Sequence, residues 1–227
     1  MSTTVPLLVH AQVQNNIIPP SGTPGSQLNA FTNRWWQGFL STNTPPQPNP
    51  FTTVFGGDCS ILTQPGNLLF LVSGVQNHGT CNISSGTSIL FPLVNGADTG
   101  PANEFISNPT TECIKIPCPT FVVIQPFKLL KDPIDVIKGA TNLVATVDGR
   151  QLQSSFVESL PGGFGVTVAA NNPFGITPVG PGQHAVAEGF WVLLPPLSTG
   201  QHTNSFSCCL PALGFCTGTI TYTLRVK

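Results

Sequence analysis

The sequence predicts an all-β protein, a β-sandwich of the jelly-roll or immunoglobulin-like type with roughly ten short strands. Runs of strand-forming residues recur along the chain, separated by turns rich in glycine and proline, of which the 227 residues contain 23 each. The clearest run is residues 220–226, where Ile220, Tyr222 and Leu224 face one side and threonines face the other. Hydrophobic residues make up 40% of the chain, enough for a substantial core.

The other predicted strands are alternating or apolar runs of strand length. They cover residues 5–14, 68–73, 89–94, 121–125, 142–147, 150–153, 164–170, 185–194 and 201–206. Asp148 and Gly149 separate two of these runs and favour a two-residue type I′ turn, and hence a β-hairpin. The last three strands are expected to form a consecutive antiparallel meander. In it, Trp191 lies in the core and Tyr222 and Leu224 face inward.

One short helix is predicted over residues 132–138. Asp132 is a good N-cap, Pro133 suits the first helical position, and Gly139 follows the last one. Five charged residues lie between positions 128 and 138, which is typical of a solvated helical face.

The chain divides into an N-terminal arm with its linker, residues 1–30, and one β-sandwich domain, residues 31–227. Residues 19–25 are rich in proline and glycine and separate the first predicted strand from the domain.

The N-terminal arm has an apolar face formed by Leu7, Val9 and Val13. An amphipathic strand left free in water invites pairing, because it exposes that face and its backbone donors and acceptors. We expect residues 2–18 to pair with the sheet edge of a neighbouring subunit. The alternative is that the arm folds back as an edge strand of its own sandwich.

The chain carries very little charge. Charged residues make up 7% and the formal net charge is −1, whereas an ordinary soluble domain has about 25% charged residues. This composition gives no basis for binding nucleic acid or an anionic membrane surface. No apolar run reaches the ~18 residues of a membrane span. So neutral an exterior suits a protein that packs against copies of itself or is covered by sugar; the alternative is a secreted monomer with a polar surface.

The chain has seven cysteines, which are Cys59, Cys81, Cys113, Cys118, Cys208, Cys209 and Cys216. No pair of Cys-x-x-Cys elements is present, so the spacing favours a disulfide framework over a zinc ribbon. The odd number leaves one thiol that is free or joined to another chain. Cys208 and Cys209 are adjacent and most easily take different partners. One of them can pair with Cys216 across a short loop. Cys113 and Cys118 can close a second small loop.

A disulfide framework indicates an extracellular or particle-surface location, whether secreted, on a cell surface or on a virion. Residues 1–21 do not have the form of a secretory signal, because a basic segment is missing and Pro6 and His10 interrupt the apolar residues. Export without such a signal, or release by lysis as for a virus, would reconcile the two observations.

Several motifs occur in a distinctive order. They are Gly57-Asp58-Cys59, Leu69-Phe70-Leu71, Cys81, Leu90-Phe91-Pro92 with Asn95, Thr146-Val147-Asp148-Gly149, and Ala185-x-Ala187-x-Gly189-x-Trp191. Over about residues 35–226 their order and spacing resemble a family of uncharacterised secreted β-sandwich proteins, mostly bacterial. The resemblance implies a secreted sandwich in which Cys59 pairs with Cys81, and it implies no particular activity. The chain departs from the family in its N-terminus and in its three C-terminal cysteines.

An enzyme is not indicated. The sequence has no nucleophile elbow, zinc-protease helix, P-loop or dinucleotide fingerprint, and no catalytic, cofactor-binding or metal-binding residue is assigned. His184 or His202 can serve as a base or metal ligand, but a hydrogen-bonded structural histidine is favoured. Glu188 beside Trp191 is the best polar–aromatic pair for a sugar site; the favoured interpretation is a solvent-facing Glu188 next to a core tryptophan. The other acidic candidates cannot be paired from sequence; they are Asp58, Glu104, Glu112 and Glu158.

Trp35 and Trp36 also have two interpretations. On a strand they would point to opposite faces, so one could fill the core while the other stacks on a sugar ring or docks a subunit. The alternative is that both pack in the core around a bend. Asn82 begins the sequon Asn82-Ile83-Ser84, a possible glycosylation site, although such tripeptides are common by chance in chains rich in Asn and Ser.

Two classes of function follow. The first is a structural, self-assembling surface protein, such as a filament, sheath or virion component, whose partners are copies of itself. The second is a secreted module that binds carbohydrate or another ligand, which an exposed aromatic row over a groove would support. No cofactor is expected in either.

Overall fold

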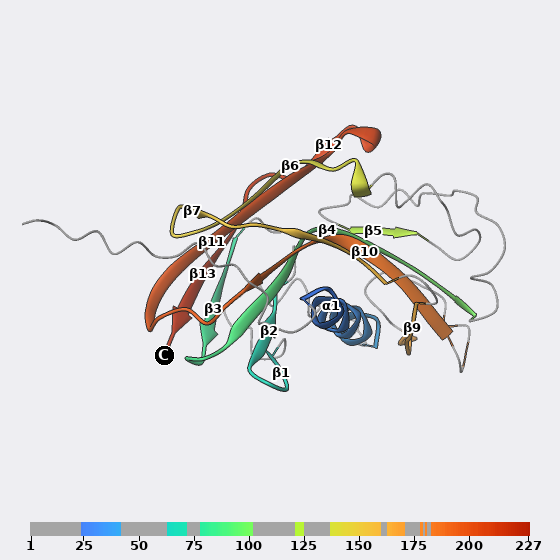
Figure 1. Ribbon diagram of the computed structural model, residues 1–227, viewed down its shortest axis with the longest axis horizontal. Helices are drawn as coiled ribbons and strands as arrows, with labels where there is room; N and C mark the ends of the chain where they lie inside the picture. Colours follow the sequence, from blue (N-terminus) through green and yellow to red (C-terminus); the bar gives the residue numbers. More distant parts are fainter. Residues whose placement is uncertain are drawn as a thin grey trace, which may run out of the picture.

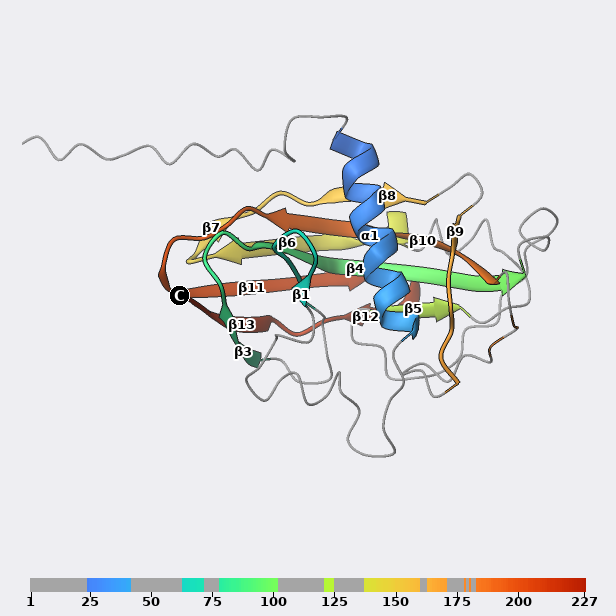
Figure 2. The ribbon, with the colours of Figure 1, turned by 90° about the horizontal axis from the view of Figure 1, so that it is seen from below.

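The computed structural model describes residues 24–41, 63–71, 78–101, 121–124, 137–159, 163–170, 178, 180 and 183–227. Two β-sheets face each other and one helix, α1 (Pro24–Ser41), covers the outer face of one sheet (Figure 1). Seen from below, α1 crosses in front of the strands of that sheet (Figure 2). The all-β, sandwich-like fold predicted from the sequence is therefore confirmed.

The first sheet, called sheet A, has seven strands among the described residues and is covered by α1. Its main path follows the order β1 (Thr63–Gln64), β2 (Leu68–Phe70), β4 (Ser88–Pro101), β10 (Gln183–Leu194) and β8 (Ser155–Glu158). Two further strands attach to it, β5 (Phe121–Ile124) to β4 and β9 (Phe164–Gly165) to β10. The antiparallel pair of β4 and β10 forms its centre, with a register shift between Phe190 and Trp191.

The second sheet, called sheet B, has six described strands. Its order is β3 (His78–Ile83), β13 (Ile220–Val226), β11 (Gly200–Leu210), β6 (Thr141–Val147) and β7 (Arg150–Gln151), with β12 (Phe215–Cys216) beside β11. The predicted hairpin is present as β6 and β7. Asp148 and Gly149 between them have φ values of 49° and 75°, the positive values that a type I′ turn requires.

The residues of β13 that face the core between the sheets are those that the sequence alternation predicted. Ile220, Tyr222 and Leu224 are almost completely buried, as predicted. Across the interface, the rings of Phe91 in β4 and Phe206 in β11 lie 4.9 Å apart. These aromatic contacts join the two sheets.

The predicted meander is wrong in one respect. β11 and β13 pair antiparallel as expected, but β10 belongs to sheet A and β11 to sheet B. The chain crosses between the sheets at residues 195–199. The alternation of β11 and β13 identified their inner faces, whereas β10 is buried along nearly its whole length and carries no such signal.

The helix α1 was not predicted, and it changes the interpretation of Trp35 and Trp36. The apolar residues Leu28, Trp35, Trp36, Phe39 and Leu40 recur at helical spacing and are all buried. Because they lie on a helix, both tryptophans reach one packed face, without the bend that the core-packing interpretation required. The helix also runs unbroken through the expected domain boundary between residues 30 and 31.

Two predicted elements cannot be compared in full. The strand at residues 5–14 lies outside the described residues, as do Leu7, Val9 and Val13, so the arm stays a prediction. Of the helix expected at 132–138, the described part contains Ile137 and Lys138, which are helical.

Trp191 links α1 to sheet A. Its ring lies 5.4 Å from that of Trp35 in an edge-to-face arrangement, and the indole N–H of Trp35 donates to the carbonyl of Leu71 at 3.1 Å. Gly189, on the same face of β10, makes room for this packing. A Cβ there would lie 2.7 Å from Trp191 Nε1 and from the Val94 carbonyl oxygen.

We therefore expect Trp191→Ala to lower the free energy of unfolding by roughly 3–5 kcal/mol, the usual cost of emptying a buried tryptophan site. Chemical denaturation of both proteins measures the difference. Leu213→Ala, at an exposed position, is the control and should stay within about 0.5 kcal/mol of the wild type. A loss below about 1 kcal/mol for Trp191→Ala would contradict this account of the core.

Candidate functional site

The proposed aromatic ligand site is not present at Trp35 and Trp36. Their exposed fractions are 1% and 0%, so neither ring has a face available to a sugar. Among the described residues, the large hydrophobic side chains that are exposed are Val144 and Leu213, and neither is aromatic. The stacking interpretation is therefore wrong, and core packing of both tryptophans is correct.

The pair formed by Glu188 and Trp191 is not a site either. Successive residues of β10 point to opposite faces of sheet A. Trp191 contacts α1, while Glu188 lies on the other face, opposite Glu158 of β8. Only 7% of Glu188 is exposed, so the expectation that it faces solvent is wrong. Glu158, for its part, lies 3.6 Å from Lys138 as an ion pair.

His202 forms the most completely connected polar cluster at the surface. Its Nδ1 lies 2.7 Å from Asp148 Oδ2, and its Nε2 lies 2.9 Å from the Ser198 carbonyl oxygen. Asp148 also accepts the backbone N–H of Thr203 at 2.8 Å. The cluster therefore ties the β6–β7 turn to the connection between β10 and β11.

This cluster has the residue types of a catalytic triad without its chemistry. Ser198 Oγ is 3.5 Å from His202 Nε2, but the nearer partner of that nitrogen is a carbonyl oxygen, which can only accept a hydrogen bond. When both ring nitrogens donate, the imidazole is protonated and cannot act as a base toward serine. His202 is thus a hydrogen-bonded structural histidine, as favoured from sequence. Among the described residues, no three His, Cys, Asp or Glu side chains are arranged to hold a metal ion.

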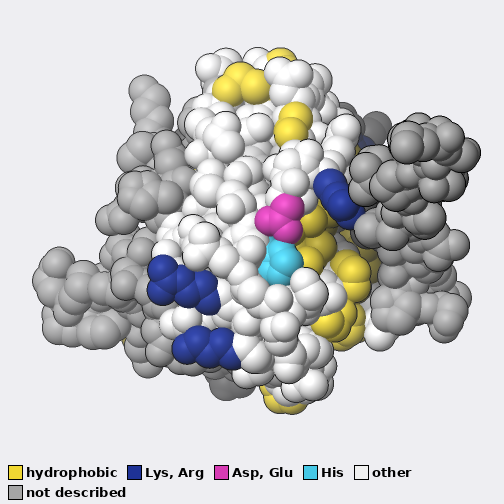
Figure 3. Space-filling view, turned by 90° about the vertical axis from the view of Figure 1, so that its left-hand side faces the viewer, with side chains coloured by type: hydrophobic (Ala, Val, Ile, Leu, Met, Phe, Trp, Pro, Cys, Tyr) yellow, Lys and Arg dark blue, Asp and Glu magenta, His cyan; other side chains and the backbone are white. Residues whose placement is uncertain are grey.

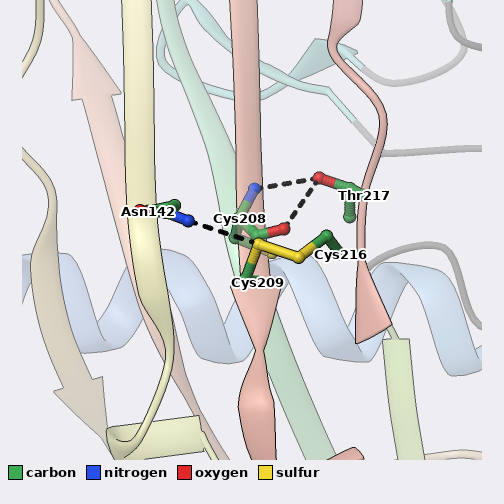
Figure 4. The surroundings of a disulfide bond; sticks show 5 residues. All are labelled: Asn142, Cys208, Cys209, Cys216 and Thr217. Carbon is green, nitrogen blue, oxygen red and sulfur yellow. Dashed lines mark hydrogen bonds between the residues drawn. A yellow bond between two sulfur atoms is a disulfide. The ribbon is translucent and has the colours of Figure 1, made fainter. Parts of the chain in front are cut away.

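The disulfide expected near the C-terminus joins Cys209 to Cys216, which face each other across β11 and β12 (Figure 4). Cys208 points to the other side of β11, is buried and is free. Thr217 brackets it, accepting the Cys208 backbone N–H at 2.9 Å. Burial raises the pKa of the Cys208 thiol to about 11, although the Thr217 hydroxyl opposes the shift. Cys208 is therefore not available to join another chain.

The remaining cysteines are only partly described. Cys81, on β3, is buried and disulfide-bonded. Cys59, the partner that the family resemblance implies, lies outside the described residues, as do Cys113 and Cys118, so their pairing stays a prediction. Asn82, next to Cys81, is exposed, and its glycosylation likewise stays a prediction.

The edges of sheet B offer backbone groups for pairing. The Ala145 carbonyl accepts the Leu152 N–H at 2.8 Å, so the backbone groups of Ala145 point away from β11. By the alternation of an antiparallel ladder, those of Leu143 do the same. Among the described residues, no strand pairs with this edge of β6 over residues 141–144. Val144 on this edge is 42% exposed.

A groove of about 620 Å³ opens on the opposite side of the molecule, where the C-terminal part of α1 meets β9 and β10. From α1 it is lined by Arg34, Gln37, Gly38 and Ser41, and from the sheet side by Pro65, Gly165, Val166, Thr167, Gln183 and His184. The Gln37 amide donates to the Gly165 carbonyl at 2.9 Å and joins its two walls. Of the candidates named from sequence, this groove contains His184. Sequence reasoning missed the groove because one wall is the unpredicted helix.

Charged side chains are few at the end of the molecule that Figure 3 shows, and an acidic side chain there lies against a histidine. Within the described part of the chain, no helix is both long and apolar enough to cross a membrane.

No protein-family model and no curated protein matches the chain, so the family resemblance stays a prediction. Two solved structures are distantly similar. One is the cysteine protease inhibitor EhICP2 from Entamoeba histolytica, with 11% identity, 70% of this chain and 96% of the inhibitor covered, and a TM-score of 0.26. The other is the solution structure of amebosin, with 11% identity, 71% and 98% covered, and a TM-score of 0.23. Similarity at this level carries no argument about function.

The His202 cluster predicts a pH dependence of stability. The hydrogen bond to Asp148, followed by that to the Ser198 carbonyl, raises the pKa of His202 above its ordinary value of 6.5. Partial burial opposes ionisation of Asp148, but hydrogen bonds from His202 and Thr203 outweigh it and lower its pKa below 3.8. Stabilisation by His202 is complete below pH 6.5 and is lost as the pH rises through the raised pKa of His202. Stabilisation by Asp148 is present above 3.8 and lost as the pH falls through the lowered pKa.

Thermal unfolding of the wild type and of His202→Gln across this range tests the prediction. The variant should be less stable than the wild type between pH 3.8 and 6.5, the ordinary pKa values of Asp148 and His202. This difference in stability should shrink at alkaline pH. His184→Gln, which leaves the cluster intact, should keep the wild-type pH profile. Parallel profiles for the wild type and His202→Gln would contradict the assignment.

Alkylation with iodoacetamide tests the cysteine assignments. In the native, unreduced protein Cys208 should stay unmodified, because it is buried and protonated, and it should react once denaturant is added. Cys209 and Cys216 should react only after reduction. If Cys59 pairs with Cys81, both should also require reduction, and alkylation of both in the unreduced, denatured protein would exclude that disulfide.

Proposed function

We propose that the protein is a structural, self-associating protein of an extracellular or particle surface, such as a filament, sheath or virion component. The observation that carries the proposal is the uncharged edge of β6 in sheet B, with which no described strand pairs over residues 141–144. The contact that we propose is strand addition, in which the N-terminal arm of one copy, residues 2–18, pairs with β6 of the next.

Unprotected sheet edges are unusual in proteins that stay monomeric. Edge strands are normally blocked by charged side chains, proline or a covering segment. β6 has none of these residues between Thr141 and Val147, and it exposes Val144. The edge strand β3, on the other side of sheet B, also has no Lys, Arg, Asp or Glu. In contrast, the edge strand β8 of sheet A carries Glu158, which is paired with Lys138.

The low charge of the whole chain supports the same proposal. A chain with 7% charged residues and a net charge of −1 offers little repulsion between copies. An arm that passes from each copy to the next makes a heterologous contact, which gives a ring or an open filament. Because the Cys208 thiol is buried, we expect the copies to associate without a disulfide between chains at that residue.

An extracellular setting is part of the proposal. The disulfide of Cys209 and Cys216 closes a short loop at one end of β11, and such bonds persist in oxidising compartments. The alternative of a carbohydrate-binding module with stacking aromatics is not adopted, because the described residues expose no large aromatic side chain.

Deleting residues 1–23, up to the start of α1, tests the proposal. The deletion variant should be folded and monomeric, because α1 and both sheets are retained. Val144→Lys should weaken assembly of the full chain, since a charge on the edge opposes strand addition. Ala30→Lys, an exposed position on α1, adds the same charge away from sheet B and should assemble like the wild type.

Analytical ultracentrifugation and electron microscopy of the same samples measure the outcome. A wild type that stays monomeric at high concentration would refute self-assembly. A deletion variant that unfolds, or that assembles as before, would refute the role of the arm.

A further inference from the structure

The groove between α1 and sheet A has the size and polarity of a small-ligand site. Its volume of about 620 Å³ lies within the range of ligand pockets, roughly 300–1,000 Å³. Its side chains offer amide and hydroxyl groups, from Gln37, Ser41 and Thr167, with Pro65 and Val166 as its main apolar members. More of its lining is apolar than polar, so it suits a ligand that combines hydroxyl groups with apolar ring faces, as a sugar does.

Two glycines keep the groove open. Gly38 has a helical backbone in the last turn of α1, where alanine would favour the helix more. A Cβ at Gly38 would meet no atom within 4 Å, so packing does not require glycine there. The same is true of Gly165 on the facing wall. The missing side chains leave room over the line where the two walls meet.

The charge of the groove is positive. Arg34 is its one Lys or Arg side chain among the described residues, and no Asp or Glu lines it. The Arg34 guanidinium is held in place, donating to the Pro65 carbonyl at 3.3 Å and lying 6.0 Å from the ring centre of Phe31. A guanidinium has five N–H donors, and the Pro65 contact uses one of them. Arginine binds carboxylates through two such donors.

We propose that this groove binds an acidic saccharide, with Arg34 holding the carboxylate of a uronic acid unit. The carbonyl oxygen of the Gln37 side chain and the hydroxyls of Ser41 and Thr167 would bind the hydroxyl groups of the sugar. His184, on β10 directly opposite Gly165 of β9, lies at the sheet side of the same groove. This site is separate from the sheet edge of the proposed function and does not depend on it.

Isothermal titration of the full chain with a short oligogalacturonate tests the proposal, and its methyl ester is the matched neutral ligand. The ester should bind at least about tenfold more weakly, since it lacks the charge that Arg34 recognises. Arg34→Gln should lose a similar factor for the acid and little for the ester. Arg225→Gln, which removes an exposed arginine on β13, should bind like the wild type.

Gly38 supplies a test independent of charge. Gly38→Gln should block the groove and abolish binding of the acid. Gly38→Ala should raise the melting temperature, because alanine favours the helix, and should weaken binding. Equal binding of acid and ester, unchanged affinity in Arg34→Gln, or no binding of the acid by the wild type would each overturn the proposal. If Gly38→Gln binds the acid with unchanged affinity, the acid binds outside this groove and the proposal is refuted.

Discussion

The packing of α1 on sheet A through Trp35 and Trp191 is the contact on which the rest of the architecture depends. It buries the outer face of β4 and β10, so sheet A is covered on both faces while sheet B keeps an outer face with exposed residues such as Thr203. The missing side chain at Gly189 lets the Trp191 ring lie against β10 and Val94. The two sheets therefore have different surroundings. The groove forms where α1 meets sheet A, and the edge of β6 that no described strand covers belongs to sheet B.

The parts of the fold that alternate were predictable from sequence, and the parts buried on both sides were not. β13 and the β6–β7 hairpin are exposed on one face, so their apolar and polar residues alternate and the turn residues mark their ends. β10 is buried on both faces, and its apolar run could not indicate which strand it pairs with. α1 was missed because its window contains Asn, Ser, Thr and Gly, which are weak helix formers. Most of the stability of such a helix comes from packing of its apolar face, here against Trp191. The candidate site was missed for the same reason, since Arg34 and His184 come together only through that helix.

Two ion pairs connect charged side chains in the part of the chain that the structure describes. His202 and Asp148 are 54 residues apart, and no local pattern connects them. Their contact holds the β6–β7 turn against the start of β11, at the end of sheet B where the chain arrives from sheet A. Lys138 and Glu158 form a second pair, near the edge of sheet A.

The separation of the two proposed sites has a consequence for how they would work together. Strand addition at β6 uses the edge of sheet B, whereas the groove lies beyond sheet A, on the far side of the sandwich core. Assembly through sheet B would leave the groove of each copy accessible, so a filament would present a regular series of identical grooves. A polymeric acidic saccharide could then occupy several grooves at once, and each further contact would be intramolecular. Affinity for the polymer would exceed that of a single groove by a large factor, with no new contact within any one copy. If both proposals hold, a shallow groove with one arginine would be sufficient for tight attachment of the assembled protein.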